Sequence, residues 1–108
     1  MKYSFARTSR LDIAYLEWNP QGERTAVLVH GWPDSPEGWG ALAVDLASAG
    51  YRVLCPALRG FGPTRFRDEA TTRSGELAAF GRDLLDFMDA IELHRPVLVG
   101  HDWGARAV

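Results

Sequence analysis

The sequence predicts an α/β fold, in which parallel strands alternate with helices. Three short and mainly apolar runs, at 26–29, 51–55 and 97–99, are bounded by glycine, proline or polar residues, as is typical of strands buried on both faces. Two stretches with apolar residues at helical spacing separate these runs. The order strand, helix, strand, helix, strand predicts parallel strands joined by right-handed crossovers.

Two further strands are expected before the first of these runs. Apolar residues alternate with polar ones on either side of the turn Thr8-Ser9-Arg10, which predicts two antiparallel strands with one face in solvent. The alternating apolar positions are Tyr3, Phe5, Leu11, Ile13 and Tyr15. A turn at 19–22 leads from this pair into the run at 26–29.

The first helix is predicted from its start and from its apolar face. Ser35 followed by Pro36 is typical of an N-cap and a first-turn proline, and Gly50 ends the pattern. The apolar face consists of Trp39, Leu42, Ala43, Leu46 and Ala47.

The second helix is expected from about Ser74 onward. Its apolar face consists of Leu77, Phe80, Leu84, Met88 and Ile91. On the opposite side of the helix, exposure to solvent is expected for Asp83, Asp86 and Asp89. The polar segment 65–73 has no pattern that predicts an element.

Composition limits the class of protein. The chain of 108 residues is one domain at most, and 46% hydrophobic residues with a net charge of -2 describe an ordinary globular protein. Basic residues are spread along the chain, so neither a nucleic acid nor an anionic membrane is expected as a partner. Residues 1–10 contain no continuous apolar stretch, so we expect no signal peptide. Cys55 is the only cysteine, so we expect neither a disulfide nor a zinc cluster within the chain. A cytoplasmic location is expected. No cofactor or metal is expected, and the oligomeric state is left open.

The chemistry is expected at residues 100–104. The segment Gly100-His101-Asp102-Trp103-Gly104 follows an apolar run, and its Gly-x-Asp-x-Gly pattern matches the strand-turn-helix nucleophile elbow. The flanking glycines permit a strained turn that raises one side chain above the sheet. The alternative is that Asp102 is an ordinary turn aspartate without a catalytic role. Asp102 is the candidate nucleophile.

A second loop is expected beside the elbow. Residues 30–35 leave the run at 26–29 at its carboxyl end, as the elbow leaves the run at 97–99. In an open α/β sheet, functional groups gather beyond the carboxyl ends of the strands. The two loops should therefore lie close together on one rim of the sheet.

An aspartate nucleophile restricts the reaction. With a reference pKa of about 4, a carboxylate is ionised at neutral pH and needs no base before it attacks. Its productive targets are saturated carbons, either an epoxide carbon or a carbon that bears a halide, and the product is an alkyl-enzyme ester. Attack of water on that ester develops an oxyanion, which needs fixed hydrogen-bond donors. The elbow offers the backbone N–H of Trp103 as one donor.

Three motifs together resemble a known family. His30-Gly31-Trp32-Pro33, Arg59-Gly60-Phe61-Gly62 and Gly100-His101-Asp102-Trp103-Gly104 resemble the N-terminal part of the α/β-hydrolase fold, nearest to epoxide hydrolases and next to haloalkane dehalogenases. The resemblance implies that the expected strands are the first five of eight, in spatial order 1-2-4-3-5. It also implies that 1–108 is the N-terminal part of a single domain that lacks the cap and the C-terminal strands.

The resemblance implies a function and two alternatives. The implied function opens an epoxide to a diol through an Asp102 ester, with the backbone N–H groups of Trp32 and Trp103 as oxyanion donors. The first alternative is a dehalogenase, in which the indole of Trp103 would hold the halide. A Trp103 that lines the pocket wall and uses only its backbone N–H is equally consistent with the sequence. A tryptophan at position 32 modestly favours the epoxide, because dehalogenases often carry asparagine there. The second alternative is an incomplete fragment without activity.

The resemblance also implies what the 108 residues do not supply. In the family, the general-base histidine, its acid partner and two cap tyrosines come after the elbow. We therefore expect the chain alone to be inactive and poorly soluble, with the run at 97–99 as an exposed sheet edge. Ala57 and Thr64 depart from the family pattern, which leaves the hydrogen bonding of their loop open.

The remaining histidines, tyrosines and the cysteine are assigned structural roles. His30 is expected to tie down the loop that follows it, His101 to pack or to support its neighbours, and His94 to be solvated. Packing roles are expected for Tyr3, Tyr15, Tyr51 and Cys55.

Overall fold

A computed structural model describes residues 2–31, 35–67 and 77–108, and describes Leu77, Trp103 and Arg106 by their backbone alone. The strands are β1 (Ser4–Arg7), β2 (Leu11–Trp18), β3 (Arg24–Val29), β4 (Tyr51–Pro56), β5 (Arg65–Phe66) and β6 (Val97–Gly100). The helices are η1 (Pro36–Trp39), α1 (Gly40–Ser48), α2 (Leu77–Ala90) and α3 (Trp103–Ala107), of which η1 is a 3-10 helix. None of the helices in these ranges is long and apolar enough to cross a bilayer.

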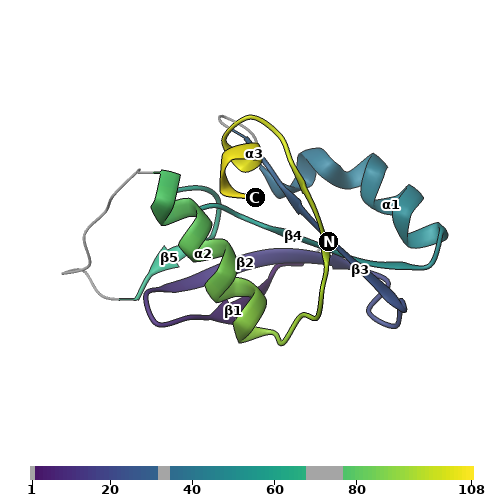
Figure 1. Cartoon of the computed structure of the whole chain (residues 1–108), viewed down its shortest axis with the longest axis horizontal. Helices are drawn as coiled ribbons and strands as arrows, with labels where there is room; N and C mark the ends of the chain where they lie inside the picture. The colour runs from purple at the N-terminus through teal and green to yellow at the C-terminus, as the bar shows by residue number, and fades with distance from the viewer. Residues whose placement is uncertain (1, 32–34, 68–76) are drawn as a thin grey trace.

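The strands form one mixed sheet in the order β1-β2-β4-β3-β6, with β5 paired to β2 (Figure 1). β2 runs antiparallel to β1, β4 and β5, whereas β3 runs parallel to β4 and β6. The fifth strand expected from the sequence is β6, so the predicted order 1-2-4-3-5 is confirmed. The order places β3 and β6, which carry the two candidate site loops, side by side.

Helices cover both faces of the sheet, with α1 on one side and α2 on the other (Figure 1). The central strand β3 alternates between two apolar clusters, because Val27 and Val29 face α2 whereas Ala26 and Leu28 face α1. Both faces are therefore buried, which explains why β3 is a continuous apolar run.

Phe87 of α2 is the largest fully buried side chain. Its ring meets Tyr15 of β2 edge to face, with centroids 5.3 Å apart and planes at 70°. The sequence pattern assigned the apolar face of α2 without Phe87. The contact shows that α2 packs on the sheet through a broader face than predicted.

The predicted solvent-exposed face of β2 is wrong. Ala14 and Leu16, on the face expected in solvent, are buried. Leu16 packs in the cluster beneath α1, and the Ala14 N–H donates to the Thr64 hydroxyl at 2.9 Å. Both faces of β2 are covered, because Ile13 and Tyr15 pack in the apolar cluster on the α2 side and Leu16 packs in the cluster on the α1 side.

The predicted burial of the run at 97–99 is wrong as well. Val97 is 51% exposed, and the rest of β6 is half-buried. β6 is the last strand in the sheet order, while α1 packs over β2 and β4. The expectation of an apolar strand at a sheet edge is therefore confirmed for the described residues.

Two local features also differ from the sequence-based expectation. Leu42 of α1 is 39% exposed, because it lies at the flank of the face centred on Ala43. β5 lies in the segment for which no element was predicted. It is held by Arg67, whose backbone N–H donates to Arg10 at 2.9 Å and whose side chain donates to the Thr8 carbonyl at 2.7 Å. Such long-range contacts leave no local pattern in the sequence.

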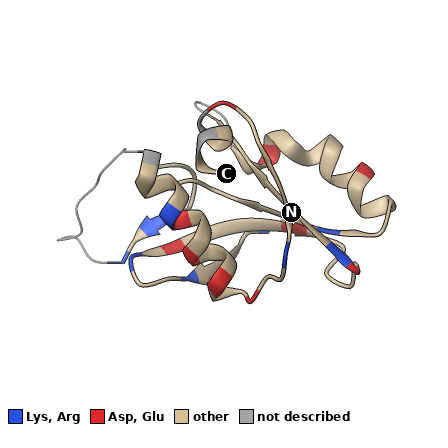
Figure 2. Cartoon of the chain, viewed as in Figure 1, with Lys and Arg blue, Asp and Glu red and all other residues tan. Residues whose placement is uncertain are grey.

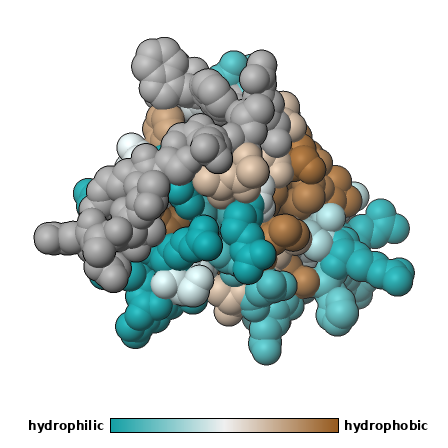
Figure 3. Space-filling view, turned by 60° about the vertical axis from the view of Figure 1, so that its left-hand side comes forward, coloured by the Kyte–Doolittle hydropathy of each residue, from teal (hydrophilic) through white to brown (hydrophobic). Residues whose placement is uncertain are grey.

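The described surface mixes polar and apolar side chains. On the face shown in Figure 3, brown apolar surface lies between hydrophilic side chains. The exposed large apolar residues are Phe5, Leu42, Val44, Leu85, Val97 and Val108.

Candidate active site

Asp102 lies in a sharp turn between β6 and α3. Its backbone has φ 57° and ψ -118°, a positive φ that a residue other than glycine rarely adopts. The turn is held by the Gly104 N–H on the His101 carbonyl at 2.9 Å and by the Ala105 N–H on the Asp102 carbonyl at 3.1 Å. Asp102 is exposed. The backbone therefore has the strained strand-turn-helix form of a nucleophile elbow.

The two flanking glycines allow this turn to pack. A Cβ added to Gly100 would lie 2.5 Å from the Gly104 carbonyl oxygen. A Cβ added to Gly104 would overlap the Val29 carbonyl oxygen and lie 2.6 Å from that of His30. Side chains at either position would push α3 away from the sheet, so the Gly-x-Asp-x-Gly pattern has a steric reason.

The loop after β3 lies directly against the elbow. Val29 pairs with Gly100 in the parallel register, and the His101 N–H donates to the Val29 carbonyl at 3.1 Å. A Cβ added to Gly31 would lie 2.5 Å from Cβ and 3.0 Å from Oδ2 of Asp102. The predicted proximity of the two loops is confirmed for Gly31 and Asp102.

The two candidate oxyanion donors are less completely defined. Trp32 lies outside the described residues, so its role stays a prediction. Trp103 is the first residue of α3 and follows Asp102, which places its backbone N–H in the elbow.

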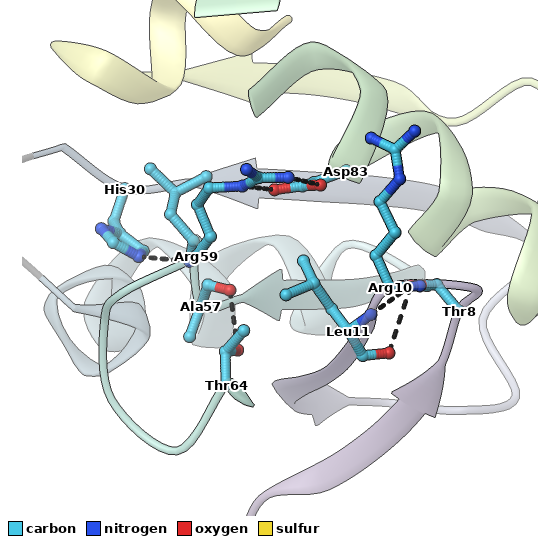
Figure 4. Close-up of polar contacts among 9 residues, drawn as sticks. Thr8, Arg10, Leu11, His30, Ala57, Arg59, Thr64 and Asp83 are labelled. Carbon is cyan, nitrogen blue, oxygen red and sulfur yellow. Dashed lines mark hydrogen bonds and ion pairs between the residues drawn. The ribbon is translucent and has the colours of Figure 1, made fainter. Parts of the chain in front are cut away.

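His30 ties down the loop after β3, as predicted, and joins it to the loop after β4. It is 1% exposed, and its Nε2 accepts the Leu58 N–H at 3.0 Å (Figure 4). Because Nε2 accepts, Nδ1 carries the proton and donates to the Gly31 carbonyl at 2.8 Å. The imidazole also meets the Phe61 ring edge to face at 5.1 Å. Both ring nitrogens are thus engaged with the backbone.

The predicted solvation of Asp83 is wrong. Its carboxylate is buried and accepts two hydrogen bonds from Arg59, from Nε at 2.6 Å and from a terminal nitrogen at 2.7 Å (Figure 4). Charges of both signs lie along α2 (Figure 2). Asp86 is half-buried and paired with Arg82 at 3.1 Å, and Asp89 is exposed, so the prediction is confirmed for Asp89.

The Arg59 guanidinium is buried as well, and it lies over the Phe66 ring at 5.3 Å. The hydrogen bonds to Asp83 raise the pKa of Arg59, so the guanidinium stays charged. The sequence drew attention to Arg59 through its loop motif. Its partner could not be found by helical period alone, since Asp83 lies at the flank of the buried face beside Phe80 and Leu84.

Thr64 closes the loop that carries Arg59. Its hydroxyl accepts the Ala14 N–H at 2.9 Å. The same hydroxyl donates to the Ala57 carbonyl at 2.9 Å (Figure 4). The Ala57 N–H in turn donates to the Ala14 carbonyl at 2.8 Å. A threonine at position 64 and an alanine at position 57 are therefore compatible with a loop whose two ends are joined by a hydrogen bond.

The sequence also assigned structural roles to the other two histidines, to the cysteine and to Tyr3. His94 is exposed as expected, whereas His101 is exposed and not packed. Cys55 is fully buried, and burial raises the pKa of its thiol to about 12. Burial and a hydrogen bond to Glu37 raise the pKa of Tyr3. Among the described residues, no group of three or more His, Cys, Asp or Glu side chains could hold a metal ion.

The fold and the elbow define the class of protein, and comparison with known families agrees. The chain belongs to the alpha/beta hydrolase fold family, whose model matches residues 26–108. Among curated proteins it is 42% identical over 86 residues to an epoxide hydrolase of Caballeronia sordidicola, which covers 79% of this chain and 26% of that protein. It is 35% identical over 101 residues to epoxide hydrolase A of Mycobacterium tuberculosis, which covers 94% of this chain and 31% of that protein.

Solved structures give the same result. The chain superposes with a TM-score of 0.94 and 39% identity on a protein from Klebsiella pneumoniae described provisionally as an epoxide hydrolase, over 98% of this chain and 35% of the other. An epoxide hydrolase from Vigna radiata gives a TM-score of 0.83 and 26% identity, over 98% of this chain and 33% of the other. The chain spans about a quarter to a third of the length of these relatives.

Proposed function

We propose that the protein carrying this chain is an epoxide hydrolase, which opens an epoxide to a diol with Asp102 as the nucleophile. The observation that supports this proposal most is the position of Asp102, exposed at a strained turn with Gly31 against it. The relatives named epoxide hydrolase support the choice of substrate class.

The first step forms an ester. A carboxylate oxygen of Asp102 attacks an epoxide carbon, the ring carbon–oxygen bond breaks, and the released oxygen takes a proton. The carboxylate needs no base for this step, because it is ionised at neutral pH. The proton donor is expected from residues outside 1–108, as the resemblance implies.

The second step releases the diol. Water adds to the carbonyl carbon of the ester and places negative charge on the Asp102 oxygen. The backbone N–H groups of Trp103 and Trp32 are the proposed donors to this oxyanion, and one such donor contributes on the order of 3 kcal/mol. The base that activates water is expected outside 1–108. Collapse of the oxyanion breaks the bond between the carbonyl carbon and the alkyl oxygen and restores the Asp102 carboxylate. The departing oxygen takes the proton that the base removed from water and becomes a hydroxyl of the diol.

The proposal is tested by substitution and by product analysis in the native protein. Asp102→Asn and Asp102→Ala should lower the rate of epoxide hydrolysis at least about 10⁴-fold. Asp89→Asn, an exposed change on α2, is the matched control and should leave the rate unchanged. The native protein should form a diol from an epoxide and release no halide from a haloalkane. Halide release without diol formation would assign the chain to the dehalogenases instead.

The location and the fragment behaviour stay proposals too. We place the protein in the cytoplasm, and fractionation of cells tests that location. We also propose that residues 1–108 alone do not turn over epoxide, since the proposed second step needs a base. Turnover by the isolated 108-residue chain would contradict this.

A further inference from the structure

We propose that Asp83, Arg59 and His30 form a positioning network that sets the orientation of the Gly31 peptide beside Asp102. Asp83, on a helix outside the elbow, would then be a positioning residue for hydrolysis of the ester. This inference rests on the proposed function. It is carried by buried hydrogen bonds that join Asp83 to Arg59, Leu58 to His30 and His30 to Gly31, and by the close packing of Gly31 against Asp102.

The first link is the ion pair between Asp83 and Arg59. The carboxylate and the guanidinium meet through two hydrogen bonds, at 2.6 Å and 2.7 Å, and both side chains are about 5% exposed. This bidentate contact fixes the plane as well as the position of the guanidinium. Because the pair is buried, removal of either partner leaves an uncompensated charge in the core. The start of the loop after β4 is therefore anchored to α2.

The second link joins that loop to His30. Leu58 directly precedes Arg59, and its backbone N–H donates to Nε2 of His30 at 3.0 Å. The Leu58 carbonyl accepts the Phe61 N–H at 3.0 Å, and the Phe61 ring packs against the imidazole. A shift of Arg59 moves the neighbouring amide that holds His30 in its orientation.

The third link joins His30 to the elbow. Nδ1 of His30 donates to the Gly31 carbonyl at 2.8 Å, while the Cα of Gly31 faces Asp102. A peptide group is planar, so a network that holds the Gly31 carbonyl would also restrain the amide N–H of the same peptide group. That amide belongs to the proposed oxyanion donor at position 32. The network thus acts on a group that is needed only when the ester is hydrolysed.

This timing separates a positioning role from a merely structural one. The first step forms a neutral ester and develops no oxyanion on Asp102, so it does not need the donor amide at position 32. The second step does depend on it, because the donor must point at the oxygen where charge develops. Loss of the network should therefore slow release of the ester and leave its formation nearly unchanged. Partial unfolding would lower the fraction of active protein and would affect both steps alike.

The test is a single-turnover measurement on the protein that carries this chain, both unsubstituted and as the Asp83→Asn variant. Styrene oxide is the probe, and Asp89→Asn is the matched control. Quenched samples report formation and decay of the ester on Asp102 by mass. We expect ester decay to slow about 10- to 100-fold in Asp83→Asn, with ester formation changed less than about threefold. Asp83→Glu, which keeps a carboxylate, should recover part of the decay rate. Equal slowing of both steps, or unchanged decay, would overturn the inference.

Two further measurements keep the test decisive. Arg59→Lys keeps the charge opposite Asp83 but loses the bidentate contact, so it serves if Asp83→Asn does not fold, and the same selective slowing is expected. If the unsubstituted protein forms no ester on Asp102, the proposed function fails, and the NMR signal of the His30 Nδ1–H then judges the network alone. That signal should shift in Asp83→Asn and not in Asp89→Asn. An unshifted signal in Asp83→Asn would overturn the network.

Discussion

Gly31 and Asp102 approach each other so closely that position 31 has room for a hydrogen atom and not for a methyl group. A Cβ on Gly31 would lie 2.5 Å from Cβ of Asp102 and 2.8 Å from the His101 carbonyl oxygen. The contact joins the loop after β3 to the elbow after β6, and it follows from the parallel pairing of these strands. A small residue at position 31 is therefore part of how the candidate nucleophile is positioned.

Gly31→Ala tests this contact. Because the clash involves Cβ and backbone atoms, the Asp102 turn has to shift, and we expect a loss of about 1–3 kcal/mol in the free energy of unfolding. A displacement near 1 Å at the nucleophile should also lower the rate of ester formation about 100-fold. Chemical denaturation of the Gly31→Ala variant measures the loss of stability. Single-turnover kinetics of the same variant measure the rate of ester formation.

Gly40→Ala is the control for that substitution. Nothing lies within 4 Å of a Cβ at position 40, and the backbone there is helical. Alanine should be neutral or stabilise α1 by up to about 1 kcal/mol. If Gly31→Ala behaved like Gly40→Ala, the close approach of Gly31 to Asp102 would be refuted.

Thr64→Val tests the hydroxyl that closes the loop after β4. The substitution preserves shape but leaves the Ala14 N–H and the Ala57 carbonyl without the Thr64 partner, so we expect a loss of about 1–3 kcal/mol for each unsatisfied group. Thr64→Ser keeps the hydroxyl and should cost clearly less. Equal losses for the two variants, measured by urea unfolding, would show that the hydroxyl is not what matters.

Phe87→Ala tests the packing of α2 on the sheet. Phe87 is fully buried against Tyr15, so its truncation should lower the free energy of unfolding by about 3–5 kcal/mol. Leu85→Ala, at a side chain that is 55% exposed on the same helix, should cost less than about 1 kcal/mol. Comparable losses at the two positions would mean that α2 does not pack through Phe87.

The burial of Cys55 has two expected consequences, for the reactivity of its thiol and for the pH dependence of stability. Burial raises the pKa of its thiol from 9.0 to about 12, so the folded protein should not be alkylated at Cys55 at pH 8, whereas the protein in denaturant should react readily. Since the unfolded thiol ionises near its ordinary pKa, stability should fall as pH rises from 9 toward 12. Cys55→Ala should reduce that fall. Peptide mapping after alkylation measures the reactivity, and rapid labelling of the folded protein would contradict the account.

Much of the fold could be predicted from the sequence, because the pattern of the central strands reports their burial. The continuous run at 26–29 indicated a strand covered on both faces, and the order of elements fixed the direction of the crossovers. The contact between Gly31 and Asp102 followed from one rule about the carboxyl ends of parallel strands. For β6, the same kind of apolar run failed to predict burial, because composition does not reveal a strand's place in the sheet.

The parts that could not be predicted depend on contacts between distant segments. Asp83, Asp86 and Asp89 recur every three residues along α2, so the sequence gives no reason to treat Asp83 differently. Only its ion pair with Arg59, which comes from another loop, distinguishes Asp83. β5 is two residues long and depends on a turn more than 50 residues earlier, through the bond from Arg67 to Thr8. The network around His30 likewise joins three loops or helices whose sequences show no mutual signal.

The central claim is that Asp102 forms an ester whose carbonyl carbon is attacked by water. The most direct measurement is one turnover of epoxide by excess native protein in oxygen-18 water, followed by mass analysis of the diol and of the peptide that contains Asp102. We expect one heavy oxygen in the Asp102 carboxylate and none in the diol. Heavy oxygen in the diol, with Asp102 unlabelled, would show that water attacks the epoxide directly and would contradict the account.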